Sequence, residues 1–88
     1  ALMSAANPQK KSATGAYHFE MKQAIPSYLF ALSVGDFAFK PISERSGIYA
    51  EASVLDTAVW EFADLEKMIA GAESLYGAYA WERYDVLV

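Results

Sequence analysis

The sequence contains no cysteine and only one histidine among its 88 residues. The lack of cysteine excludes a disulfide framework and thiolate chemistry, and it fits a reducing compartment. Basic residues are also few: Lys10 and Lys11 form the longest run, and the net charge is −4. Nothing in this sequence would neutralise a row of phosphates, so we expect no nucleic-acid partner.

Long apolar runs are missing as well. The longest, AIPSYLFALSVG, has 12 residues and contains a proline. A membrane-spanning helix needs about 20 predominantly apolar residues. The start of the chain also lacks a basic segment followed by an apolar one. The sequence therefore predicts neither a membrane span nor a signal peptide.

The chain is nevertheless rich in groups that can form a core, since 55% of its residues are hydrophobic and 15% are aromatic. We expect one small structural unit over residues 1–88, which buries about 60–65% of the surface that the unfolded chain exposes. Both ends, ALMSA and YDVLV, are apolar, whereas natural termini are usually polar and frayed. We interpret both ends as cuts in a longer protein.

Alternation of apolar and polar residues predicts strands in the first half of the chain. Residues Tyr17–Lys22 alternate with a period of two, which is typical of a strand with one wet face. Ser27–Val34 is apolar on both faces and is the best candidate for a central strand covered on both sides. The apolar parity reverses after Gly35, which favours a bend or bulge there. Shorter strands are expected at Phe37–Phe39 and Ile48–Glu51.

After Leu55 the apolar period becomes that of a helix. Apolar residues recur at steps of three and four and form one stripe: Ala58, Val59, Phe62, Leu65, Ile69, Ala72 and Tyr76. Ser53 is the predicted N-cap, Gly77 the predicted end, and Gly71 a predicted bend or close approach. A final strand is expected at Trp81–Val88. The predicted fold class is α+β, with a small, mostly antiparallel sheet of about four or five strands packed with one long helix near the C-terminal end.

Catalytic and metal-binding patterns are nearly absent. Zinc catalysis needs about three converging protein ligands. Because His18 is the only histidine, we interpret it as a solvent-facing residue on a strand. Ser33, Ser46 and Ser53 have no histidine close in the sequence that would activate a hydroxyl. The glycines are isolated and form no phosphate-binding loop.

The charged and aromatic residues are assigned to surface and core. Most carboxylates are expected on the solvated face of the helix, where Asp64 and Lys67 have the spacing of a surface ion pair. The aromatic residues are interpreted as core rather than as a binding groove: Tyr17, Tyr28, Trp60, Tyr76, Tyr79, Trp81 and Tyr84. Trp60 is the exception, because it falls beside the helical stripe and is expected at a surface that another domain covers.

Three segments of the chain carry a family resemblance: IPSYLFALSVGDF, RSGIYAE and WEFADLEKMIAGAESLYGAYAWERYDVLV. In this order they resemble the zinc aminopeptidases that include aminopeptidase N and the leukotriene hydrolase/aminopeptidase (gluzincin metallopeptidases, family M one). The resemblance runs from Leu2 to Val88 and is most specific from Glu61 onward. Two residues depart from the pattern, with Ala78 in place of a proline and Glu82 in place of a glycine. Both bear on the geometry of that loop.

The resemblance implies a place within a larger enzyme. Residues 1–51 would end an N-terminal β-rich domain, and residues 52–88 would begin a thermolysin-like catalytic domain. The parent enzyme would use zinc-activated water to remove N-terminal residues from peptides. Its metal-binding H-E-x-x-H helix, third glutamate ligand and substrate-binding G-x-M-E-N motif would all follow Val88. The resemblance therefore assigns no catalytic, metal, cofactor or substrate residue to this chain.

Two functional interpretations follow. In the first, the chain is a non-catalytic scaffold fragment of a cytoplasmic zinc aminopeptidase, and its partner is the remainder of the parent chain. In the second, it is a stand-alone α+β protein-interaction module with no enzymatic role. If both ends are cuts, a further hypothesis follows: the chain exposes apolar surface, including Trp60 and the edge of Tyr84–Val88, and can self-associate through it.

Overall fold

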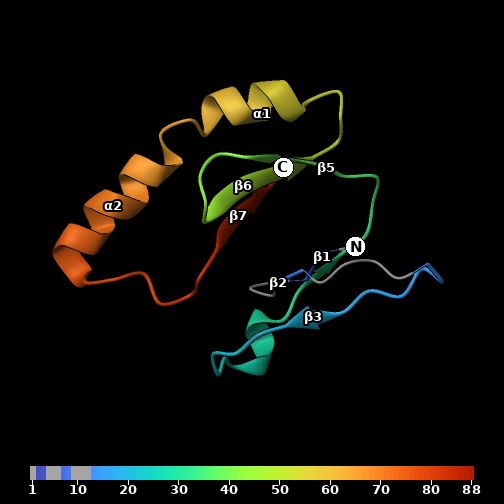
Figure 1. Cartoon of the computed structure of the whole chain (residues 1–88), viewed down its shortest axis with the longest axis horizontal. Helices are drawn as coiled ribbons and strands as arrows, with labels where there is room; N and C mark the ends of the chain where they lie inside the picture. The colour runs from blue at the N-terminus through green and yellow to red at the C-terminus, as the bar shows by residue number, and fades with distance from the viewer. Residues whose placement is uncertain (1, 4–6, 9–12) are drawn as a thin grey trace. The chain divides into compact units, whose positions relative to one another are not determined.

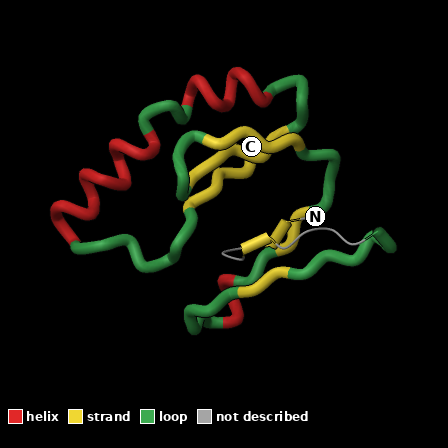
Figure 2. Tube along the Cα trace, in the orientation of Figure 1, coloured by secondary structure: helices red, strands yellow, loops and turns green. Residues whose placement is uncertain are grey.

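The computed structural model describes residues 2–3, 7–8 and 13–88 of the chain. The chain divides into two compact units, Ala1–Gly35 and Asp36–Val88. Figures 1 and 2 show the elements that make up each unit. The first unit ends at a bend at Gly35, so the bend predicted there from the change in parity is confirmed. The domain boundary predicted between residues 51 and 52 refers to the longer protein and stays a prediction.

The first unit contains short strand pairs rather than a continuous sheet. β1 (Leu2–Met3) pairs antiparallel with β4 (Leu32–Ser33). β2 (Asn7–Pro8) pairs antiparallel with β3 (Phe19–Glu20). A single turn of 3-10 helix, η1 (Ser27–Leu29), lies between β3 and β4. The strand expected over residues 17–22 is thus present only at its centre.

The central strand predicted over Ser27–Val34 is wrong. Pro26, with φ of −61°, precedes η1, and only two residues later pair in β4. Tyr28, Phe30 and Val34 are 82%, 63% and 77% exposed. An apolar pattern identifies side chains that share a face, but burial also requires a second layer to pack on that face. The described residues do not provide that layer over this segment.

The second unit is built on a three-stranded mixed sheet. β5 (Ala38–Pro41) pairs antiparallel with β6 (Ser46–Ala50), and β6 pairs in parallel with β7 (Tyr84–Leu87). A parallel pair needs a long crossover, and here it is formed by α1 (Leu55–Glu61) and α2 (Leu65–Tyr76). Figure 1 shows both helices on one side of the sheet. The predicted α+β class, with a helical segment followed by a final strand, is confirmed. The sheet itself is smaller than the predicted four or five mostly antiparallel strands, because the described strands form one three-stranded mixed sheet and two separate two-stranded pairs.

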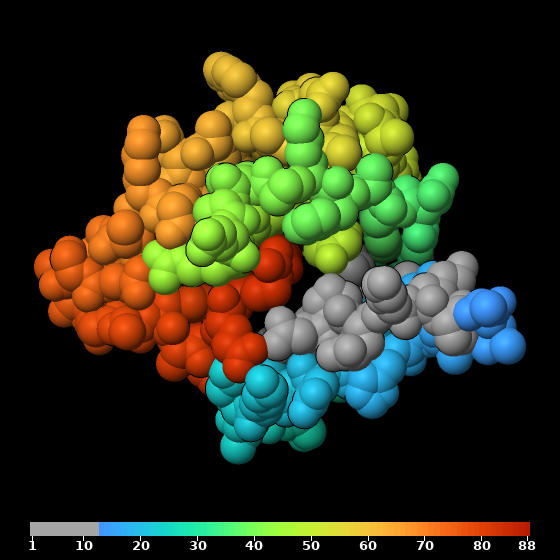
Figure 3. All heavy atoms as spheres, in the orientation of Figure 1, coloured from blue at the N-terminus to red at the C-terminus, as the bar shows by residue number. Residues whose placement is uncertain are grey.

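The core of the second unit lies between α1 and the sheet. Ile48 and Ala50 of β6 are fully buried, and Ala58 of α1 is only 5% exposed. Partly buried hydrophobic residues pack against these three: Ile42, Leu55, Val59, Phe62 and Val86. Leu65 and Ile69 of α2 are also buried, so the first part of the predicted helical stripe is confirmed. The other sides of the helices form outer surface in the space-filling view (Figure 3).

The helical segment breaks at residues 62–64, between α1 and α2. Gly71 lies inside α2, and a Cβ added there would meet nothing within 4 Å. The bend or close approach predicted at Gly71 is therefore wrong. Neither proline nor glycine stands at the break, so a local helix breaker does not explain it. The break coincides instead with the packing of Phe62 against the core.

The two ends of the helical segment differ in how well the sequence predicted them. Ser53 is not the N-cap, because Val54 takes that position and makes no side-chain capping bond. Asp56 lies in the first turn of α1, where its charge complements the helix dipole. Gly77 ends α2 as predicted, with φ of 94° and its N–H donating to the Glu73 carbonyl at 2.9 Å.

Candidate functional site

A network of polar side chains centres on Arg45, in the turn between β5 and β6. Its Nε donates to Glu66 Oε1 at 2.9 Å, and its Nη2 donates to Glu73 Oε1 at 2.5 Å. Both glutamates belong to α2. Because they are seven residues apart, they lie two turns apart on the same side of the helix. One guanidinium therefore fastens two turns of α2 to the β5–β6 turn.

Serine hydroxyls and a backbone amide complete this network. Ser43 Oγ donates to Glu66 Oε2 at 2.8 Å and also lies 2.8 Å from Ser46 Oγ. The Tyr79 N–H donates to Glu73 Oε2 at 3.0 Å. Each of the four carboxylate oxygens therefore has a donor. Ser46 is fully buried, and its partner is another serine, so its hydroxyl has a structural role.

The contacts hold both carboxyl groups in their charged form. The hydrogen bond from Arg45, with a second from Ser43, lowers the pKa of Glu66. The pKa of Glu73 is lowered by Arg45 and by the Tyr79 N–H. In return, the hydrogen bonds to Glu73 and Glu66 raise the pKa of Arg45. A general acid or base works best with a pKa near the operating pH, so this network positions α2 and is not built for proton transfer.

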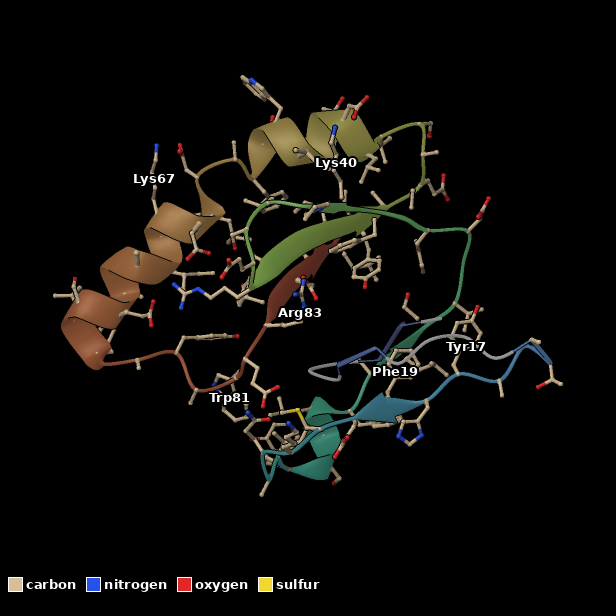
Figure 4. The ribbon with its side chains drawn as sticks, in the orientation of Figure 1. Tyr17, Phe19, Lys40, Lys67, Trp81 and Arg83 are labelled. Carbon is tan, nitrogen blue, oxygen red and sulfur yellow. The ribbon has the colours of Figure 1, made fainter. Side chains whose placement is uncertain are left out.

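A second cluster holds the start of β7. Arg83 makes a bidentate contact with Asp85, through Nε at 3.0 Å and Nη2 at 2.8 Å. Its Nη1 donates to the Glu44 carbonyl at 3.1 Å, and the Tyr79 hydroxyl donates to the Arg83 carbonyl at 3.2 Å. Figure 4 shows Arg83 beside β7. The hydrogen bonds to Asp85 raise the pKa of Arg83. The Arg45 network thus joins the β5–β6 turn to α2, and the Arg83 cluster joins the same turn to the chain that follows α2.

The residues singled out as metal or nucleophile candidates do not come together. His18 is exposed, as expected for a solvent-facing residue. In residues 2–3, 7–8 and 13–88, no group of three or more His, Cys, Asp and Glu side chains could hold a metal ion. The Asp64–Lys67 ion pair is confirmed at 2.9 Å, with both side chains largely exposed. None of the helices in these ranges is long and apolar enough to cross a membrane.

The interpretation of the aromatic residues as core is wrong for most of them. Tyr28 and Tyr76 are 82% and 87% exposed. Three others are between 41% and 45% exposed: Tyr17, Trp81 and Tyr84. Tyr79 is half-buried. Trp60 is 76% exposed, so its expected surface position is confirmed. The periodicity assigned these residues to predicted strands and helices. In the described part of the chain, too few other elements pack on those strands and helices to cover the aromatic side chains.

Sequence reasoning missed the Arg45 network, because it treated the glutamates of the helix as a solvated face. One signal was present: Glu66 and Glu73 share a side of the helix through their spacing of seven residues. The partner could not be read from the spacing. Arg45 lies 21 residues before Glu66 and 28 before Glu73, and only the crossover brings them together.

Comparison with known proteins yields curated relatives along the whole chain, although no family model matches it. The chain is 49% identical to leucine aminopeptidase 2 of Yarrowia lipolytica over 76 residues, which cover 85% of this chain and 12% of that protein. It is 41% identical to leukotriene A-4 hydrolase of Xenopus laevis over 93 residues, which cover 100% of this chain and 15% of that protein. Human aminopeptidase B is 40% identical over 88 residues, which cover 99% of this chain and 13% of that protein.

Solved structures of leukotriene A4 hydrolase also match this chain. The native yeast leukotriene A4 hydrolase matches with a TM-score of 0.92 and 38% identity, over 99% of this chain and 14% of that one. The yeast enzyme in complex with bestatin matches with a TM-score of 0.90 and 36% identity, again over 99% and 14%. The chain spans only 12–15% of the curated relatives described above. Over its whole length, the chain is homologous to the family of aminopeptidases and leukotriene A4 hydrolases that its sequence resembles.

Proposed function

We propose that this chain is a non-catalytic structural segment of a larger parent protein, a zinc-dependent aminopeptidase. The parent would remove N-terminal residues from peptides with metal-activated water. One observation carries the proposal. The chain aligns along 99–100% of its own length with proteins named as aminopeptidase B and leukotriene A-4 hydrolase, yet covers only 13–15% of theirs. A segment of that size contributes part of a fold. Activity on peptides would then belong to the whole parent protein, which we expect in the cytoplasm.

The donor groups of the described residues do not fit a zinc site. Three converging ligands are usual for catalytic zinc, and His18 is an exposed, single histidine. The two carboxylates of the Arg45 network, Glu66 and Glu73, both accept hydrogen bonds from Arg45. The proposal therefore assigns the metal to the remainder of the parent chain. The role of this segment is to hold α2 and the sheet in a fixed arrangement.

Exposed apolar side chains mark where the remainder of the parent would pack. On α2, Met68 and Leu75 are 58% and 76% exposed. Their spacing of seven residues places them on one side of the helix. Trp60 on α1 is 76% exposed. Single exposed apolar residues are ordinary, but three large ones on the two helices of one unit support the proposal that the remainder of the parent covers these helices.

A chimera tests the proposal. In leukotriene A-4 hydrolase of Xenopus laevis, the matching segment is replaced by this chain, and the product is assayed for zinc content and for cleavage of leucine-p-nitroanilide. We expect the chimera to retain both. A matched chimera with Ile48→Asp should lose both, because that substitution places a charge in the core.

Two results would contradict the proposal. The first is a chimera that folds, as judged by circular dichroism, but neither binds zinc nor cleaves the substrate. The second is stoichiometric tight zinc binding or turnover by the 88-residue chain alone, which would show that this segment contains its own site.

A further inference from the structure

The two halves of α2 are held in different ways. In the first half, Leu65 and Ile69 are buried. In the second half, residues 70–76, Glu73 alone is partly buried and every other residue is exposed. Most of the stability of a helix in a protein comes from the packing of an apolar face. The first half is therefore anchored by apolar packing, whereas the second half is not.

Glu73 connects the second half of α2 to the rest of the unit. One of its carboxylate oxygens accepts a hydrogen bond from Arg45 Nη2, in the β5–β6 turn, and the other accepts one from the Tyr79 N–H, in the loop after α2. Among the described residues, no other side chain of residues 70–76 has a hydrogen bond or ion pair with another element. The position of this half therefore depends on one carboxylate and its two donors.

Both ends of this stretch are fixed independently of Glu73. Before it, Ile69 is buried. After it, the Tyr79 hydroxyl donates to the Arg83 carbonyl at 3.2 Å, and the Tyr79 ring lies edge-on to that of Tyr84, with ring centroids 6.2 Å apart. Residues 70–77 thus form a length of chain between two anchored points.

A helical stretch as short as residues 70–77 is marginal without outside contacts. Isolated helices shorter than about 12–15 residues are barely stable in water. Gly71 lies inside the stretch, and glycine disfavours a helix interior. Arg45 is held in place by a second carboxylate, Glu66, in the anchored half of α2. The guanidinium therefore stays available when the contact to Glu73 breaks, and the contact can form again.

We propose that residues 70–77 open and close as a local unit while α1 and the sheet stay folded, and that Arg45 is the latch that holds them closed. The inference goes beyond the proposed function and does not depend on it, because every contact that carries it lies within Asp36–Val88. Opening breaks the contacts of Glu73 and the helical hydrogen bonds of the segment, among them the bond from the Gly77 N–H to the Glu73 carbonyl.

Native-state hydrogen exchange of the 88-residue chain tests the latch. The amides of residues 74–77 report local opening, because in the helix they donate to the carbonyls four residues earlier. The amides of β6 and α1 report unfolding of the whole unit. In the wild type, the amides of residues 74–77 should exchange at least about tenfold faster than those of β6. Their exchange should also depend less on low urea concentrations, because local opening exposes less surface.

Substitutions of the latch should act on the segment and not on the sheet. Arg45→Met removes the donors, so exchange at residues 74–77 should become about tenfold faster or more relative to β6. Arg45→Lys keeps the charge without the forked donors and should give an intermediate rate. Glu73→Gln weakens the same contact and should also speed this exchange. Glu66→Gln is the matched control, and it should change these rates less than about threefold, because its half of α2 is anchored by apolar packing.

A substitution away from the latch should act in the opposite direction. A Cβ added at Gly71 meets nothing within 4 Å, so Gly71→Ala should slow exchange at residues 74–77 about two- to fivefold through helix propensity alone. Three results would overturn the proposal. They are wild-type rates and urea dependence at residues 74–77 equal to those of β6, an equal acceleration of both regions in Arg45→Met, and equal effects of Glu66→Gln and Glu73→Gln. The last comparison stands even where Arg45→Met fails to fold.

Discussion

Gly47 and Phe39 provide a quantitative test of how the sheet is packed. A Cβ added to Gly47 would lie 2.3 Å from Cε2 and Cζ of Phe39, and 3.1 Å from the Lys40 carbonyl oxygen. Carbon atoms in contact normally lie about 3.5–4.0 Å apart, so the ring would have to move by more than about 1 Å. The same ring packs against Tyr49, with ring centroids 4.6 Å apart. Gly47 therefore leaves the space that the Phe39 ring occupies.

Two opposing effects set the magnitude for Gly47→Ala. Overpacking typically costs about 1–3 kcal/mol. Alanine gains about 0.5–1 kcal/mol over glycine within a strand, because it loses less backbone entropy on folding. The free energy of unfolding should therefore fall by about 1–2 kcal/mol in the wild-type background. This is a measurable share of the roughly 3–8 kcal/mol expected for a unit of this size.

Removing the ring first should reverse the sign. In the Phe39→Ala background, Gly47→Ala meets only the Lys40 carbonyl and should be neutral or stabilise by up to about 1 kcal/mol. The two substitutions should thus be coupled by about 1–3 kcal/mol in a double-mutant cycle. Urea unfolding of the four proteins, followed by far-UV circular dichroism with m-values checked for constancy, gives this coupling. An equal cost of Gly47→Ala in both backgrounds would refute the reasoning, as would a neutral effect in the wild type.

Three further substitutions or conditions test other parts of the fold. Glu82 has φ of 66°, a left-handed conformation that costs most residues about 1–2 kcal/mol. Glu82→Gly should therefore raise the melting temperature, with a gain of up to about 1 kcal/mol after the entropy cost of glycine, and a lower melting temperature would argue against this account. The pKa of Glu66 and of Glu73 is lowered in the folded state. Their contribution to stability is thus present above the ordinary value of 4.5 and is lost as the pH falls through the lowered pKa. Melting temperature should fall more steeply below about pH 4.5 in the wild type than in the Glu66→Gln, Glu73→Gln double variant, and equal slopes would contradict the network. Ile48 is fully buried. Ile48→Ala should cost about 2–5 kcal/mol and Ile48→Val about 0.5–1.5 kcal/mol in urea unfolding, and similar costs for both would place Ile48 outside the core.

One departure from the family pattern, at Glu82, coincides with an unusual backbone conformation. Glu82, where the resemblance leads one to expect glycine, adopts a positive φ of 66°. Glycine is the residue that takes this conformation without strain. The backbone of this loop is thus kept in the glycine-type conformation by its surroundings, which include the Tyr79 and Arg83 contacts on either side.

The sequence by itself determined the features that depend on local chemistry. The change from a period of two to steps of three and four identified the helical segment, because side-chain direction follows directly from backbone geometry. Gly77 as the helix end followed from the conformations that glycine permits, and the bend at Gly35 followed from the change in apolar parity around a glycine. The family resemblance likewise followed from the order of three segments along the sequence, and it needed no knowledge of the structure.

The tertiary structure alone decided which of these elements are buried and what they contact. The crossover made β7 parallel to β6 and placed Arg45 beside Glu66 and Glu73, and no spacing in the sequence specifies either. The break at residues 62–64 arose where Phe62 meets the core, although the apolar stripe runs through it without interruption. Ser27–Val34 has the pattern of a buried strand and is exposed. The physical reason is common to all of these cases: periodicity is a property of one segment, whereas burial, pairing and ion contacts are properties of two.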